Sequence, residues 1–168
     1  VHVAANETQV IIGMLLELTY ALAVVGIIVT LFPVLKRHHE TSALGFFSFR
    51  LMEAISILIH SLSLLLLLTL SQQYVAAGMP DMADYQVAGS LLLASREWVF
   101  LIGSGIVWSL SALILNLLLF QKSLIPRWLS GWGLVGAGLS LLAYGFRFFH
   151  INLPELFYLP IGVQEKLR

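Results

Sequence analysis

Four long apolar stretches constrain the fold of this chain more than any other feature. They cover about residues 10–35, 43–70, 97–120 and 128–150. A helix that crosses a bilayer needs about 20 mostly apolar residues, because hydrocarbon offers no partner to an unpaired backbone N–H or C=O group. Each stretch is long enough. We therefore predict an all-α integral membrane protein, a bundle of four complete transmembrane helices in one domain, residues 1–168.

The composition also indicates a lipid environment. Of the 168 residues, 59% are hydrophobic and 11% are charged, which is roughly half the charged fraction of an average soluble domain. The formal net charge is zero and there is no basic tract, so nucleic acid is not an expected partner. The lack of cysteine excludes thiolate metal sites and thiol nucleophiles. We expect no metal site and no cofactor, since two histidines on separate spans, His60 and His150, are a thin basis for a haem site.

Residues 71–95, between the second and third spans, have two interpretations. The segment begins polar and contains Gly78 and Pro80. Its more apolar part, residues 85–94, forms either an interfacial helix or an extension of the third span, and we favour the interfacial helix. After the fourth span, Pro160 opens an apolar stretch from Ile161 to Val163. This stretch predicts the start of a further segment at residues 160–168.

Basic residues predict how the chain is oriented. Lys36 and Arg37 lie between the first two spans, and Lys122 and Arg127 lie between the last two. Short loops that are rich in Lys and Arg stay in the cytoplasm. Both ends of the given chain are therefore expected on the outer side of the membrane.

Ionisable residues at membrane depth are the candidate functional residues, because each is costly there unless it is paired or hydrated. Arg50, Glu53 and His60 are three and seven residues apart, so they share one face of the second helix. Glu17 lies in the first span with no obvious partner on its own helix, and Glu97 lies at the outer entrance to the third. We expect these five residues to form a ligand-binding or proton-relay site in an outward-facing pocket. The peripheral candidates are Arg96, Tyr144, Arg147 and His150.

A structural role is the alternative for most of these residues. Arg50 and Glu53 would form an ion pair that ties helices together, and Arg147 would extend to the headgroups. His60 would be a hydrogen-bonded packing residue. Glu17 is the hardest to explain in this way, because a carboxyl group within a span usually has a function or is kept protonated.

Small residues in the last two spans indicate close packing between helices. Gly103 and Gly105 lie in the third span, and Gly133 and Ala137 have small-xxx-small spacing in the fourth. Small side chains let two backbones approach closely. We expect these positions to be helix contacts rather than parts of a site.

Several short motifs, in a fixed order, carry a family resemblance. The chain resembles a bacterial family of multi-pass membrane proteins known only as a domain of unknown function. The resemblance implies a six-span architecture, of which this chain would be an excerpt, and a location in the bacterial cytoplasmic (inner) membrane. The chain departs from the family pattern at Arg96-Glu97-Trp98, where the family commonly has His-Asp-Trp. The motifs are Leu16-Glu17, Phe32-Pro33-Val34-Leu35-Lys36-Arg37, Phe49-Arg50-Leu51-Met52-Glu53-Ala54, Ile125-Pro126-Arg127-Trp128-Leu129 and Leu159-Pro160-Ile161-Gly162-Val163-Gln164-Glu165.

Three functions remain open from the sequence. The first is a polar intramembrane site in the outer half that binds or moves a small amphiphile, a lipid or a proton. The second is an accessory structural subunit of a larger membrane complex. The third is an intramembrane acid–base enzyme acting on a lipophilic substrate, with Glu53 or Glu97 as acid or base, His60 as proton shuttle and Arg50 as electrostatic stabiliser. The expected partners are membrane lipids, other membrane proteins or further copies of the chain.

Overall fold

Helices account for almost all of the described structure, which is a computed structural model covering residues 6–78 and 83–149. Within these residues, four helices are long and apolar enough to cross a membrane, which confirms the all-α, four-span fold class. The third consists of three consecutive segments. The elements are α2 (Glu7–His38), α3 (Glu40–Ala76), α4 (Ala83–Val99), the π-helix η1 (Phe100–Val107), α5 (Trp108–Lys122) and α6 (Arg127–Phe148).

The third spanning helix differs from our expectation at its beginning. It runs without a break from Ala83 to Lys122, 40 residues. Residues 85–94 therefore extend the third span, and the favoured interpretation as a separate interfacial helix is wrong. The physical reason is that α3 continues to Ala76 and gives α4 a packing partner, with the rings of Tyr74 and Tyr85 5.1 Å apart.

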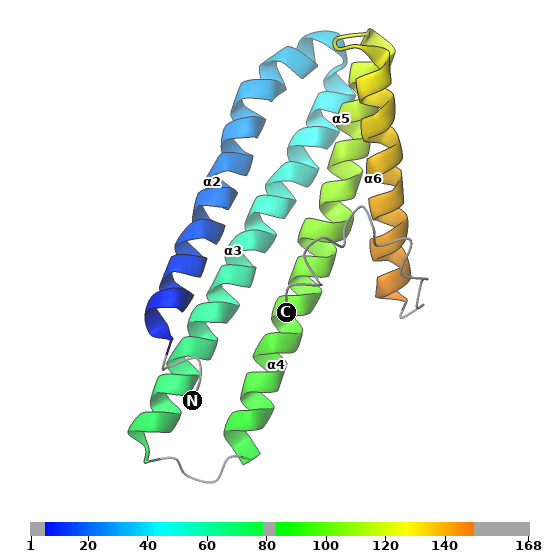
Figure 1. The fold of residues 1–168 in the computed structure, drawn as a ribbon. Coiled ribbons are helices and arrows are strands. Elements are labelled where there is room, and N and C mark those ends of the chain that lie inside the picture. Colours follow the sequence, from blue (N-terminus) through cyan, green and yellow to red (C-terminus); the bar gives the residue numbers. More distant parts are fainter. Residues whose placement is uncertain (1–5, 79–82, 150–168) are drawn as a thin grey trace.

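The helices lie side by side in chain order and form an open layer (Figure 1). On one side α3 packs against α2 and on the other against the third helix, and α6 packs against η1 and α5. In the part of the chain that the structure describes, α2 and α6 make no comparable contact with each other. The two inner helices are accordingly more buried than the two outer ones.

The two ends of the layer, along the helix axes, differ, and we name each for what it contains. The basic end holds the α2–α3 and α5–α6 turns, with Lys36, Arg37 and Lys122 in the last helical turns beside it. The hairpin end is the opposite end of the layer, where α3 ends and α4 begins. Since α6 has only 22 residues, α3 and α4 extend well beyond it toward the hairpin end (Figure 1).

The turns at the basic end have local causes. His39 has an extended backbone, and its Nδ1 accepts a hydrogen bond from the Ser42 N–H at 3.1 Å, which caps α3. Ser123 adopts the left-handed conformation with φ 51° and ends α5. Pro126, which has no N–H to satisfy, directly precedes α6. These short turns hold consecutive helices antiparallel.

The π-helix η1 packs closely against both of its neighbouring spans. Gly103 faces Ser56 on α3, and a Cβ at Gly105 would lie 2.7 Å from the ring of Tyr144 on α6. The π-helix therefore touches both neighbouring spans at positions that only glycine fits. Tyr144, a peripheral site candidate, is a packing partner at this contact.

Replacing Gly103 by alanine should destabilise the protein. A Cβ there would overlap the Ser56 side chain, and overpacking of this kind costs about 1–3 kcal/mol. Gly136→Ala is the matched control, because a Cβ at Gly136 meets nothing within 4 Å. Thermal unfolding in detergent, followed by circular dichroism, should show a lower midpoint for Gly103→Ala alone. Equal midpoints would contradict the close contact between α3 and η1.

Candidate functional site

Glu17 lies at the centre of a polar cluster built from three helices. Its Oε2 accepts a hydrogen bond from Ser61 Oγ at 2.6 Å and lies 3.2 Å from His60 Nδ1. Its Oε1 accepts a hydrogen bond from Arg96 Nη2. The partners that Glu17 lacks on α2 thus come from α3 and α4. We call Glu17, His60, Ser61 and Arg96 the Glu17 cluster.

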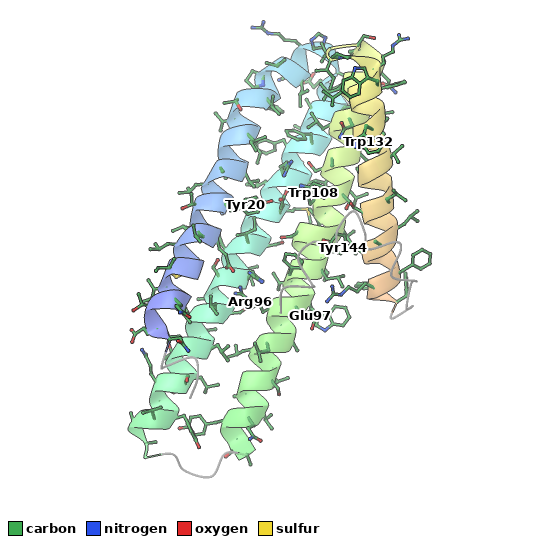
Figure 2. The ribbon with its side chains drawn as sticks, in the orientation of Figure 1. Tyr20, Arg96, Glu97, Trp108, Trp132 and Tyr144 are labelled. Atoms are coloured by element: carbon green, nitrogen blue, oxygen red, sulfur yellow. The ribbon has the colours of Figure 1, made fainter. Side chains whose placement is uncertain are left out.

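Arg96 bridges the layer within this cluster. Its Nη1 donates to the backbone carbonyl of His60 at 2.9 Å, while its Nη2 reaches Glu17. Because α2 and α4 lie on opposite sides of α3, the guanidinium group crosses the face of α3 to connect them (Figure 2). The side chains of Glu17, His60 and Arg96 remain 23%, 17% and 22% exposed. The cluster is therefore reachable from one surface of the layer.

A second cluster, which we call the Glu53 cluster, comprises Tyr20, Arg50 and Glu53. The Glu53 side chain is fully buried and accepts hydrogen bonds from Arg50 Nη1 at 2.8 Å and from Tyr20 Oη at 3.0 Å. The guanidinium group of Arg50 also lies 5.9 Å from the Phe46 ring centroid, within range of a cation–π interaction. Arg50 and Glu53 thus form the ion pair of the structural alternative, but both lie on α3, and the contact that ties α2 to α3 is the hydrogen bond from Tyr20.

Glu97 belongs to neither cluster. It forms an ion pair with Arg147 on α6, with 2.8 Å between Oε1 and Nη2, and both side chains are well exposed. Arg96 and Glu97 are neighbours in sequence, yet Arg96 points toward α3 and Glu97 toward α6 (Figure 2). The five main candidates are therefore divided among three groups instead of lining one pocket.

His150 lies outside the described residues, as does the segment 160–168. Within residues 6–78 and 83–149, no three His, Asp or Glu side chains form a group able to hold a metal ion. Sequence reasoning missed Tyr20 and Ser61 as participants. Their only signal was a hydroxyl group within an apolar span, one turn from Glu17 or beside His60.

The π-helix begins four residues after Arg96. The ring of Phe100, its first residue, lies 5.9 Å from the ring of His60. Eight residues of π-helix are unusual, since π-turns mostly occur singly and often at functional sites. The irregular part of the third span thus adjoins the Glu17 cluster.

Among the described residues, four helices long and apolar enough to cross a membrane, with ion pairs within and between them, define a polytopic α-helical membrane protein. The chain belongs to the family described as Domain of unknown function (DUF4386), whose sequence profile matches residues 1–167. This confirms the resemblance to a family of unknown function. Neither the curated proteins nor the solved structures include a significant match to the chain.

Removing the buried carboxylate should destabilise the protein much more than removing the exposed one. Glu53→Gln leaves the Arg50 guanidinium without its counter-charge, and breaking a buried pair costs about 3–5 kcal/mol. Glu97→Gln breaks an exposed pair, which is worth about 1 kcal/mol or less. Unfolding midpoints in detergent measure both. Similar losses in the two variants would show that the Glu53 cluster does not hold α2 to α3.

Proposed function

We propose that this protein binds a small amphiphile with an acidic headgroup at the Glu17 cluster, in the bacterial cytoplasmic membrane. The observation that carries the proposal is Arg96, whose guanidinium group holds a carboxylate across the face of α3 while staying partly exposed. A guanidinium group matches carboxylate and phosphate oxygens in geometry and charge. An acidic ligand group can therefore take the place of the Glu17 carboxylate on Arg96.

The depth of the cluster supports a headgroup as the ligand. We place the basic end in the cytoplasm, because Lys and Arg flank its turns. Glu17 and His60 lie about 30 Å along their helices from that end, at about 1.5 Å per residue. A hydrocarbon core is about 30 Å thick. The Glu17 cluster then lies near the outer boundary of the core, where acidic lipid headgroups also lie.

Ligand exchange at Arg96 would also involve a proton. When a ligand carboxylate pairs with Arg96, Glu17 keeps its hydrogen bond from Ser61 and its contact with His60. The displaced carboxylate then takes up a proton or pairs with a protonated His60, which keeps the site neutral. Amphiphile binding and proton uptake are therefore coupled in this proposal.

An accessory subunit is the second candidate, and the open layer favours it. Along the described residues, α2 and α6 each pack extensively against only one neighbouring span. Edge helices of this kind leave long surfaces on which partner helices can pack. Native mass spectrometry of gently extracted protein separates the two candidates. A stable complex with other subunits favours the accessory role, and a monomer with a bound amphiphile favours the binding role.

Two substitutions in the Glu17 cluster should change ligand affinity in opposite directions. Arg96→Gln removes the cation and should weaken binding of dodecanoic acid at least tenfold, since a hydrogen bond to a charged group contributes about 1.5–3 kcal/mol. Glu17→Gln removes the competing carboxylate and should strengthen binding. Titration by native mass spectrometry measures both affinities.

Dodecanol and Arg147→Gln are the controls for this titration. The alcohol has the same chain without the acid, and Arg147 is the exposed cation paired with Glu97. We expect dodecanol to bind weakly and Arg147→Gln to bind the acid like the unmodified protein. If both cluster variants lose affinity equally, or if acid and alcohol bind alike, recognition of an acidic group at Arg96 is wrong.

A further inference from the structure

A groove of about 500 Å³ lies between α3 and α4, on the hairpin side of the Glu17 cluster. On α3 it is lined by Leu66, Leu70 and Gln73, and on α4 by Ala88 and Leu92. Its walls are mostly hydrocarbon, and its volume falls within the range of about 300–1,000 Å³ that small-molecule sites occupy. An apolar ligand fits this chemistry.

The groove leads toward Arg96. Ala88, Leu92 and Arg96 follow one another at intervals of four residues, so they lie along one face of α4. At the opposite limit of the groove, the paired rings of Tyr74 and Tyr85 connect α3 to α4. From Tyr85 to Arg96 is about 16 Å along the helix. The groove is thus apolar for most of its length, and Arg96 lies about one helical turn beyond Leu92, its last lining residue on α4.

We propose that this groove holds the single alkyl chain of an acidic amphiphile whose headgroup pairs with Arg96. The inference rests on the proposed function and adds the class of ligand: a single-chain acid such as a fatty acid. Charge complementarity selects this occupant, because the apolar groove points toward the guanidinium group of Arg96. A single groove between two helices accommodates one alkyl chain, whereas a two-chain lipid would leave its second alkyl chain outside.

The groove would separate the chain from the bilayer. The Glu17 cluster is placed near the outer boundary of the hydrocarbon core, and the groove lies beyond it toward the hairpin end. A 37-residue α3 and a 40-residue third helix are both longer than a core about 30 Å thick requires. The bound chain then lies between protein helices instead of among lipid tails. The site would therefore withdraw a single-chain acid from the membrane.

The chain length of the ligand provides the first test. Saturated acids of increasing length are titrated against the full-length protein by native mass spectrometry. Each added CH₂ group that enters the groove should raise affinity about fourfold, which corresponds to the transfer free energy of one buried methylene. The increase should stop once the groove is filled. Affinity that does not depend on chain length would overturn the inference.

A groove-filling substitution provides the second test. Ala88→Phe places a ring in the groove and should weaken dodecanoic acid binding about tenfold or more, because the ring displaces several methylene groups. Val87→Phe is the matched control, since Val87 is the next residue and is 61% exposed. It should bind like the unmodified protein. Leu92→Trp fills the same groove and serves if Ala88→Phe does not fold.

The outcomes distinguish this inference from the proposed function. If Arg96→Gln weakens binding and both groove-filling variants bind normally, the headgroup site stands and the chain lies elsewhere. If the groove-filling variants weaken binding and Arg96→Gln does not, the groove binds a chain without recognising its acid, which overturns both the proposed function and this inference as stated. If Arg96→Gln and the groove-filling variants all weaken binding and Val87→Phe does not, the result supports a single-chain acid as the ligand.

Discussion

The ion pair between Glu17 and Arg96 is the interaction on which the arrangement of the first three spans depends. The helices α2 and α4 are separated by α3, and Arg96 joins them across its face while also bonding the His60 carbonyl. A partly buried ion that loses its partner is destabilised, because it is left without a compensating charge. The layer therefore retains this geometry unless another charge replaces one of the two. The same contact is therefore both a structural tie and the proposed ligand site.

Arg96 and Glu97 contact different helices because successive side chains on an α-helix point about 100° apart. Arg96 faces α3, and Glu97 faces α6. In the π-helix that follows, Gly103 and Gly105 admit Ser56 and Tyr144. Close packing on both sides thus holds α4 at the orientation that directs Arg96 toward Glu17.

The sequence was sufficient to predict the spans, because the length of an apolar stretch directly reflects bilayer thickness. It misjudged residues 85–94, since a helix that begins with polar residues resembles an interfacial segment until its packing on α3 is known. The prediction of close packing at Gly103 and Gly105 agrees with the structure. The spans and the glycine contacts depend on local composition, which a single sequence contains.

The candidate site was predictable only in part. The cost of charge in hydrocarbon identifies Glu17 and Arg96 as residues that need partners, but not which partners they find. Their pairing depends on how α2, α3 and α4 are aligned along one another, a property of three helices together. Tyr20 and Ser61 were missed because neutral hydroxyl groups carry no comparable signal. The alignment of the helices also explains why the residues of the expected pocket are divided among three groups.

The most direct test measures the distance between α2 and α4 with and without ligand. The chain contains no cysteine, so spin labels on Ile12→Cys and Ser90→Cys report this distance alone. Double electron–electron resonance in lipid nanodiscs should show a longer or broader distance distribution with saturating dodecanoic acid, because the ligand releases Glu17 from Arg96. Glu17→Gln should show the same change without ligand. Distances that stay unchanged at saturation would contradict exchange at Arg96 and leave the ion pair as a structural tie.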